Sequence, residues 1–416
     1  MRNPLSALRD LRGPLAVLAA MLFVSQLGIG VMLPIIPLYA MALGATPRDL
    51  GLLTTAFSLA NVGAQLGVGF ILDRIDPRVP VRVGIATYAA ANVLISTASA
   101  VPPLLLFRGL AGLGAGANIV ADRVYLSKIA DPARLAYLNG LLASAGSAGA
   151  LMGPAIGGLL AQVADLGAPF VVVGITSGIA FLASLRLPAA PGPASVAGGV
   201  MTSAFNRPVI VLLVANTLLL SAFGGFITTF APFATTTFGW STVEVGIVFS
   251  VFASGSIALA APLGGLADRR GRRLVGTYAT VPVFLFGLTL ALELQRPVIY
   301  AAAFLAGAGI STFSACWFAL LTEASPEARR GRTFGIVNAI STLGVIVGAN
   351  GAAAIWELSD IRAALVATGL MAMLGGLTLS FLGPGAGQAE PAAQAARRRV
   401  EEERRLSGLP RDGGEL

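Results

Sequence analysis

The sequence predicts an all-α polytopic membrane protein whose twelve transmembrane helices form two pseudo-symmetric halves of six helices each. Of the 416 residues, 56% are hydrophobic and only 12% are charged, whereas a soluble domain carries about a quarter charged residues. Apolar stretches of the roughly 20 residues needed to cross a bilayer recur from Pro14 almost to the C-terminus. Short motifs also recur at a constant spacing, which indicates an internal repeat.

Apolar runs separated by turn formers or charged residues define the expected helices. These helices cover 14–40, 49–72, 79–101, 103–127, 137–162, 168–188, 208–234, 242–267, 274–294, 297–322, 332–356 and 362–383. The breaks lie, in chain order, at Thr46–Asp49, Asp76–Arg78, Pro102–Pro103, Asp131–Pro132, Asp268–Arg273 and Ser325–Pro326.

The repeat divides the chain into two halves. Gly69-x3-Asp73-Arg74 recurs as Gly264-x3-Asp268-Arg269, and the stretch 30–37 is echoed by 225–232, in both cases 195 residues later. Such symmetry is typical of transporters whose site lies between the halves. We therefore expect an N-terminal half at 1–188, a cytoplasmic linker at 189–207, a C-terminal half at 208–383 and a disordered cytoplasmic tail at 384–416.

Basic residues gather in alternate loops, which predicts the orientation in the membrane. The basic loops carry Arg2, Arg9, Arg12, Arg74, Arg78, Arg82, Lys128, Arg134, Arg207, Arg269, Arg270, Arg272, Arg273, Arg329, Arg330 and Arg332, and the other loops carry Arg48, Arg296 and Arg362. The first set, and with it both termini, is expected in the cytoplasm. The net charge of +8 therefore reflects topology and not nucleic-acid binding.

Composition also limits the chemistry. The single cysteine, Cys316, excludes an internal disulfide and a multi-cysteine metal site, and the absence of histidine removes the commonest metal ligand and general base. We expect no metal, no cofactor and no enzymatic activity.

Four motifs carry mechanism. The loop motif G-x-x-x-D-[RK]-x-G-R-[RK] is complete at Gly264, Asp268, Arg269, Gly271, Arg272 and Arg273, and partial at Gly69, Asp73, Arg74 and Arg78, where Asp76 replaces the second glycine. Arg108 begins R-x-x-x-G-x-G in the fourth helix. The fifth helix carries G-x-x-x-G-P-x-x-G-G at Gly149, Gly153, Pro154, Gly157 and Gly158. The first helix carries Leu27-Gly28-x5-Pro34-x2-Pro37.

Over residues 14–383 these motifs resemble those of the major facilitator superfamily, and within it the twelve-helix drug:proton antiporters. The resemblance implies a gating role for the loop and fifth-helix motifs, with Asp73 latching near Arg332, and proton transfer involving Arg108. The alternatives are that Asp73 and Asp268 only set topology, that Arg108 extends to the membrane surface, and that the glycines serve general packing.

The resemblance also implies a cavity lined by the first, fourth, seventh and tenth helices, with the second, fifth, eighth and eleventh beside them. The expected substrate-cavity residues are Gln26, Asn61, Gln65, Asn118, Asn216, Phe223, Ser314, Trp317 and Asn338. Asp122 lies in the helix that carries Arg108 and is the candidate proton carrier; the alternative is a charge pair with Arg123.

The resemblance thus implies secondary export of a small amphiphilic compound or drug by proton antiport with alternating access. The alternative is a metabolite or sugar transporter, acting as a uniporter or symporter on the same fold. The expected partners are a small-molecule substrate, protons and the lipid bilayer. We expect a monomer in a bacterial inner membrane.

Overall fold

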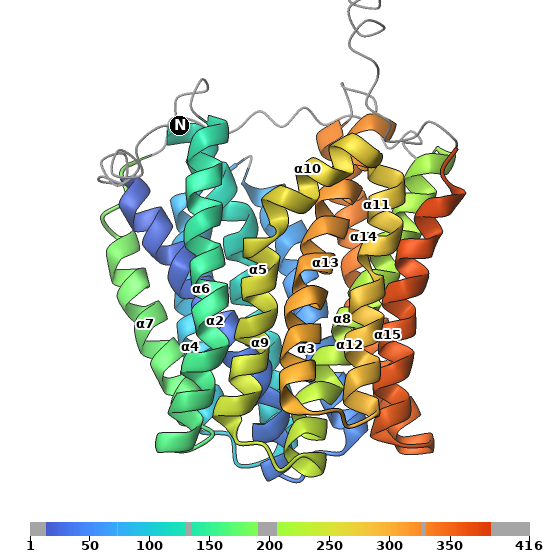
Figure 1. Cartoon of the computed structure of the whole chain (residues 1–416). Coiled ribbons are helices and arrows are strands. Elements are labelled where there is room, and N and C mark those ends of the chain that lie inside the picture. Colours follow the sequence, from blue (N-terminus) through green and yellow to red (C-terminus); the bar gives the residue numbers. More distant parts are fainter. Residues whose placement is uncertain (1–13, 73, 130–134, 190–205, 326–329, 384–416) are drawn as a thin grey trace, which may run out of the picture.

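The computed structural model describes residues 14–72, 74–129, 135–189, 206–325 and 330–383, which form an upright bundle of helices (Figure 1). The first half contains α2 (Pro14–Ala42), α3 (Pro47–Ile71), α4 (Arg78–Ser96), α5 (Val101–Ile129), α6 (Leu135–Val163) and α7 (Ala168–Ser184). The second half contains α8 (Arg207–Thr237), α9 (Thr242–Ala258), α10 (Ala260–Arg270), α11 (Arg272–Ala279), α12 (Val281–Ala291), α13 (Arg296–Ala324), α14 (Arg330–Leu358) and α15 (Ile361–Thr378), followed by a 3-10 turn at Leu379–Phe381.

These helices make up the predicted twelve spans. Nine spans of the described chain are long and apolar enough to cross a membrane, counting α11 and α12 as the single span Arg272–Ala291. The bent pair α9–α10 makes a tenth. The remaining two are α7, an apolar helix of 17 residues, and α3, a helix of 25 residues. Helix α3 is less apolar because it carries polar side chains into the interior, among them Asn61 and Gln65.

The bend between α9 and α10 differs from the prediction of one continuous helix at 242–267. The two helices meet at Leu259 at an angle of 49°. Pro262 lies in the first turn of α10. Its ring clashes with the carbonyl of the residue four positions earlier, and proline has no backbone N–H to donate to that carbonyl. The proline therefore gives a physical reason for the bend.

The internal repeat is also visible in the helix starts. Pro47 and Thr242, which begin α3 and α9, are 195 residues apart, as are the first residues of α5 and α13 and those of α6 and α14. Both α3 and α9 begin with a capping box, Thr46 with Asp49 and Ser241 with Glu244, in which side chain and backbone exchange hydrogen bonds. The 195-residue offset therefore identifies equivalent positions in the two halves.

The bundle has two distinct ends. At one end, which we call the basic end, lie Arg74, Arg78, Lys128, Arg269 and Arg270, and α10 marks it at the top of Figure 1. The other end, which we call the opposite end, carries the two capping boxes. Each half has a buried cluster of apolar side chains toward each end.

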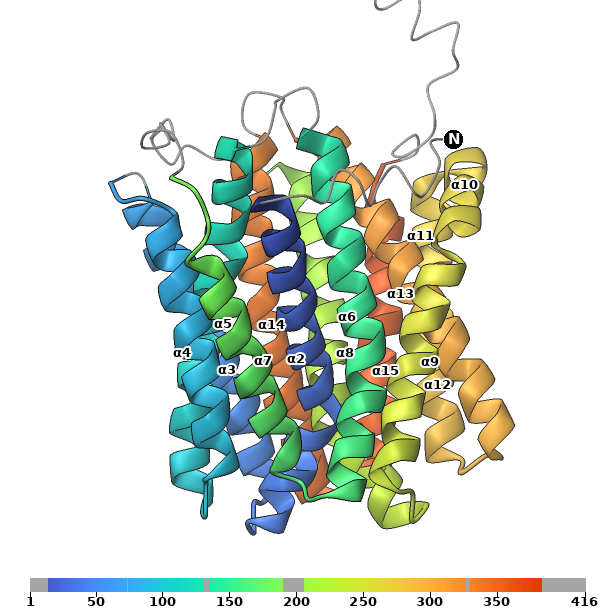
Figure 2. The same cartoon turned by 90° about the vertical axis from the view of Figure 1, so that its left-hand side faces the viewer.

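The halves meet mainly along two helix pairs, α6 with α9 and α3 with α14. The repeat relates α3 to α9 and α6 to α14, so it exchanges one pair for the other. Figure 2, turned by 90°, shows α6 and α9 running side by side along one face of the bundle. The two contacts are therefore equivalent halves of one pseudo-symmetric interface.

Candidate functional site: a cavity between the halves

Glycines in α5 determine where Arg108 lies. A Cβ atom at Gly112 would be 2.3 Å from the backbone oxygen of Phe57, and one at Gly116 would be 2.2 Å from that of Asn61. A Cβ at Gly114 would be 2.6 Å from the backbone oxygen of Gly84. Only glycine permits these approaches, so the motif that follows Arg108 packs α5 directly against α3 and α4.

This packing turns Arg108 into the space between the halves. Its guanidinium carbon lies 4.4 Å from the centre of the Phe57 ring, and Nη1 donates to Sδ of Met32 over 3.3 Å. The Nε of Arg108 and the hydroxyl of Tyr88 are buried without a hydrogen-bond partner. Arg108 therefore does not extend to the membrane surface, and its charge lies in a largely apolar setting.

A central cavity surrounds this arginine. It spans about 720 Å³ of space free of protein atoms, part of it open to solvent. The walls come from α2, α3, α4 and α5 of the first half and from α8 and α14 of the second. The lining residues are Ile29, Met32, Leu33, Thr54, Phe57, Ser58, Asn61, Tyr88, Arg108, Phe223, Ile227, Thr342 and Val345. A second cavity shares Leu33, Thr54, Arg108 and Ile227 with it.

The glycine motif of the fifth predicted helix, which is α6 in the structure, packs against helices of both halves. Cβ atoms at Gly149, Gly153 and Gly157 would lie 2.3, 2.6 and 2.5 Å from backbone oxygens of α2. A Cβ at Gly158 would instead lie 2.3 Å from the backbone oxygen of Thr242 in α9. Three glycines of the motif therefore pack within the first half, while Gly158 meets the second half.

Hydrogen bonds join the halves at the opposite end. The hydroxyl of Thr242 donates to the backbone oxygen of Gly158 over 2.8 Å, and that of Ser250 donates to Leu151 over 3.0 Å. Asn350 donates to Thr55 over 2.7 Å. The backbone N–H of Arg48 donates to a carboxylate oxygen of Glu357 over 3.0 Å. Three of these bonds lie in the outer part of α3, α6, α9 or α14, and the bond between Ser250 and Leu151 lies near the middle of α6, so this end is closed.

Toward the basic end, several glycines of α3, α10 and α14 have open space around them. Added Cβ atoms at Gly63, Gly67 and Gly69 of α3 would meet no atom within 4 Å, and the same holds for Gly264 of α10 and Gly335 of α14. Among the bonds described between residues of the two halves, none lies in this region. The bonds between the halves that the described residues show therefore lie at the opposite end or near the middle of the bundle.

Of the substrate-cavity residues predicted from sequence, Asn61 and Phe223 line the central cavity. Gln65 lies one turn further on and donates to Asn61 over 2.7 Å. Asn118 packs against α4, because its Oδ1 would be 2.2 Å from a Cβ at Gly84. Trp317 is buried in the core of the second half and donates to the backbone oxygen of Leu212 over 2.7 Å.

The other four predicted residues do not line the central cavity. Gln26 is half-buried against α6, where its Cγ would be 3.3 Å from a Cβ at Gly146. Asn216 and Ser314 are half-buried, and Asn338 is exposed. Their role as substrate contacts stays a prediction.

The loop motif differs between the halves. Gly271 has a φ of +97°, which favours glycine, and it ends α10. Beside it, Arg272 pairs with Asp268 over 2.8 Å and with Glu323 over 2.6 Å, while Arg269 is exposed and Arg273 donates to the backbone oxygen of Ser380.

In the first half, Asp76 stands at the position of Gly271. It pairs with Arg78 over 2.7 Å and accepts a bond from the Arg78 backbone N–H. The hydrogen bond from the Arg78 side chain holds the pKa of Asp76 below its usual value. Arg74 is exposed. Asp73 and the side chain of Arg332 lie outside the described residues, so the predicted latch between them stays a prediction.

Asp122 lies toward the basic end of α5, away from the central cavity. Its Oδ1 is buried without a hydrogen-bond partner. No ion pair joins it to Arg123 among the described residues, and Arg123 is exposed. The alternative of a charge pair with Arg123 is therefore wrong.

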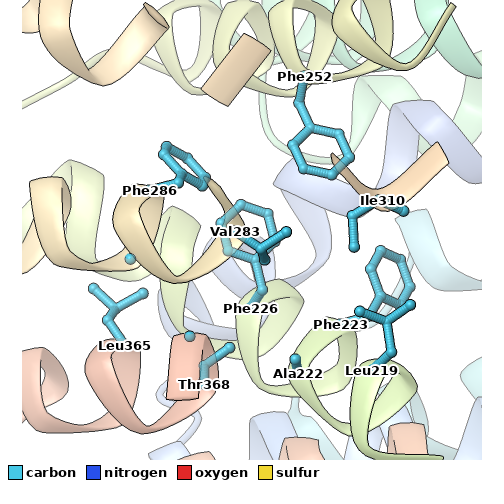
Figure 3. A pocket seen from close by; sticks show the side chains of 12 residues that line it. Leu219, Ala222, Phe223, Phe226, Phe252, Val283, Phe286, Ile310, Leu365 and Thr368 are labelled. Carbon is cyan, nitrogen blue, oxygen red and sulfur yellow. The ribbon is translucent and has the colours of Figure 1, made fainter. Parts of the chain in front are cut away.

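Sequence reasoning missed several lining residues. Tyr88 was not singled out because α4 was not expected to line the cavity. Met32, Thr54 and Phe57 lie on α2 and α3, which were expected to contribute, but no motif marks them. The structure also has an apolar pocket in the second half, and the predicted cavity residue Phe223 belongs to its lining. It is lined by side chains of α8, α9, α12, α13 and α15, including Phe223, Phe226, Phe252 and Phe286 (Figure 3).

Two helical halves that share a cavity and are joined by hydrogen bonds toward one end define a membrane protein of the secondary-transporter class. The sequence profile of the Major Facilitator Superfamily matches residues 18–292 and 212–410. The chain therefore belongs to the Major Facilitator Superfamily, whose members are transporters and not enzymes.

Relatives in sequence include the quinolone resistance protein NorA of Staphylococcus aureus (strain MSSA476), which is 28% identical over 212 residues, 49% of this chain and 54% of that protein. The chain thus spans about half the length of the curated relatives it matches. In structure, a bacterial homologue of the human lysosomal transporter Spinster, inward-facing and occupied, has a TM-score of 0.74 at 15% identity over 88% of this chain and 95% of that chain. The nucleoside transporter NupG has a TM-score of 0.72 at 13% identity, over 89% of this chain and 98% of that chain. At such identities the likeness shows the fold alone.

Proposed function

We propose that this transporter exports a small amphiphilic compound in exchange for protons, by alternating access of the central cavity to the two sides of the membrane. The observation that carries the proposal is the position of the G-x-x-x-G-P-x-x-G-G motif. It lies where α6 packs against α2 and, through Gly158, against α9 of the other half. The motif thus spans a contact that must separate when the opposite end opens.

The name and sequence of the quinolone resistance relative support export over uptake. The cavity wall supports an amphiphilic substrate. Ile29, Leu33 and Val345 offer apolar surface, while Asn61, Thr54 and Arg108 offer hydrogen bonds. A few polar groups in an apolar cavity are typical of small-molecule sites.

We place the basic end in the cytoplasm of a bacterial inner membrane, with both termini inside, because Arg and Lys are enriched there. In that orientation the hydrogen bonds between the halves close the periplasmic side, as we expect of the state that receives a substrate for export. We propose that the protein acts as a monomer, since each chain contains both halves of the cavity.

Asp122 is our candidate for the proton-carrying group. It is a carboxyl group inside a membrane span, and its Oδ1 is buried without a hydrogen-bond partner among the described residues. Movement of the halves would change its exposure to water, which supports a role in binding and releasing a proton.

Everted membrane vesicles test the proposal. With an imposed inside-acid pH gradient, vesicles that contain the protein should accumulate norfloxacin, and a protonophore should release it. Accumulation equal to that of vesicles without the protein contradicts export of this compound class. Accumulation that a protonophore leaves unchanged contradicts proton coupling and favours a uniporter.

A further inference from the structure

The two halves differ in chemistry at equivalent positions around the cavity. The 195-residue offset pairs Arg108 with Ala303 and Tyr88 with Val283. Ala303 is fully buried, and Val283 lines the apolar pocket. Phe57 of the first half, in contrast, is matched by Phe252. The first half therefore has a cation and a phenol at positions where the second half has aliphatic side chains.

The part of the site in the first half, around Arg108 and Tyr88, is suited to bind an anion. The guanidinium of Arg108 lies over the Phe57 ring and has only a thioether as a hydrogen-bond acceptor, a weak one. The buried Nε of Arg108 and the buried hydroxyl of Tyr88 have no hydrogen-bond partner among the residues that the structure describes. The lining of the two cavities that contain Arg108 includes no Asp or Glu. A buried guanidinium without a counter-charge is unfavourable, and a carboxylate can accept two of its N–H groups at once.

The apolar pocket in the second half is suited to bind an apolar ring. The pocket spans about 480 Å³ free of protein atoms, part of it open to solvent. Figure 3 shows the rings of Phe226, Phe252 and Phe286, which come from three helices, around this space. Thr368 is the one polar side chain in its lining, and its hydroxyl already donates to Ala364.

Phe223 belongs both to the cavity around Arg108 and to the apolar pocket. Its equivalent position in the first half is Gly28. A bound molecule that reaches Arg108 can therefore contact Phe223 with its other end. The site is therefore charged at Arg108 and apolar at Phe223.

We propose that the substrate is an aromatic carboxylate, bound with its carboxylate on Arg108 and Tyr88 and with its ring system toward Phe223 and the apolar pocket. This inference rests on the proposed function, because it treats the cavity as the transport site. It assigns Arg108 a contact with substrate, in addition to any part in proton transfer.

Three matched probes test the inference: 2-naphthoate, the uncharged 2-naphthamide and the cationic 2-naphthylmethylamine. Equilibrium binding to the purified full-length protein in detergent requires no pH gradient. The wild type should bind 2-naphthoate about tenfold or more tightly than 2-naphthamide, since a hydrogen-bonded charge is lost with the amide. It should bind the amine most weakly.

The variant Arg108→Gln should remove this preference and leave 2-naphthamide binding within about twofold. Arg186→Gln, at an exposed position just beyond α7, should keep it. Phe223→Ala should weaken all three probes alike. Equal binding of the three probes to the wild type overturns the inference, and so does an Arg108→Gln protein of normal thermal stability that keeps the preference for 2-naphthoate. A wild type that shows the preference but fails to accumulate substrate in vesicles would leave the anion site standing and contradict the proposed function instead.

Discussion

Asn350 of α14 donates a hydrogen bond of 2.7 Å to the hydroxyl of Thr55 on α3, and so joins the two halves at the opposite end. Gly51 lies one turn earlier on α3, where a Cβ would be 2.9 Å from Oδ1 of the same asparagine. Asn350 also donates to the backbone oxygen of Ile346 in its own helix. The contact is therefore specific to the state in which this end is closed.

Replacement of Thr55 by valine should favour opening of the opposite end. The change keeps the shape of the side chain and removes the bond from Asn350 between the halves, worth about 0.5–1.5 kcal/mol. It also removes the bond that the Thr55 hydroxyl donates to the backbone oxygen of Gly51, but that bond lies within α3 and does not join the halves. The closed state should become about two- to tenfold less populated relative to the open state. The distance distribution between spin labels at Val163 and Leu292, both exposed near this end, measures the shift. An unchanged distribution would show that the bond does not hold the closed state.

Gly158→Ala should have a similar effect through the other helix pair. The added methyl would lie 2.3 Å from the backbone oxygen of Thr242, so α6 and α9 would have to separate. Crowding of this kind costs about 1–3 kcal/mol. The same spin-label pair should report a larger open fraction, and the rate of transport should fall. If the closed fraction stays at its wild-type level, Gly158 is not required for the contact between the halves.

Gly153→Ala should instead destabilise the first half itself, because its methyl would lie 2.6 Å from the backbone oxygen of Leu27 within the α2–α6 pair. We expect the thermal unfolding temperature in detergent to drop. Gly178→Ala is the matched control, since no atom lies within 4 Å of the added methyl and alanine favours a helix over glycine. A protein with Gly153→Ala as stable as this control would contradict the packing role.

Cysteine labels test the orientation. Introduced cysteines at Thr46 and Gln295, both exposed at the opposite end, should react with an impermeant maleimide in intact cells. Cysteines at Arg74 and Ser127, exposed toward the basic end, should react only after the membrane is permeabilised. The native Cys316 is buried and gives a low background. Labelling of position 74 in intact cells would reverse the topology.

Much of the fold was predictable because it follows from local pattern. Apolar runs, turn residues and the 195-residue repeat indicated the twelve helices in two halves, and the repeat reappears in the paired capping boxes. The break at Leu259 was missed, although Pro262 marks it. The site was less predictable. Helical periodicity shows that Asn118 and Trp317 face inward, but not that Asn118 meets α4 and Trp317 the core of the second half.

The roles of the glycines show the same limit. The fifth-helix motif was visible in the sequence, but its spacing does not tell which neighbour each glycine meets. In the structure Gly149, Gly153 and Gly157 meet α2, and Gly158 meets α9. Tyr88 carried no sequence signal, because a single tyrosine in an apolar helix is as common in a core as in a site.

Asp122→Asn should abolish transport driven by a pH gradient and leave substrate binding unchanged, because an amide keeps the size of the side chain but cannot take up a proton. Accumulation of norfloxacin in everted vesicles and equilibrium binding to the purified protein measure the two properties. Asp165→Asn is the matched control. Asp165 is exposed at the opposite end, and the amide oxygen can still accept the bonds from Gly167 and Ala168. If Asp122→Asn still accumulates norfloxacin against a gradient, the proton site lies elsewhere.

The central claim is that substrate and protons move in opposite directions through one protein. The most direct measurement is proton movement driven by substrate alone, in proteoliposomes that contain a trapped pH-sensitive dye and no initial pH gradient. Addition of norfloxacin outside should make the lumen more alkaline in wild-type proteoliposomes, at a rate that saturates with concentration, and should have no such effect with Asp122→Asn. A lumen whose pH stays constant while norfloxacin enters would contradict antiport.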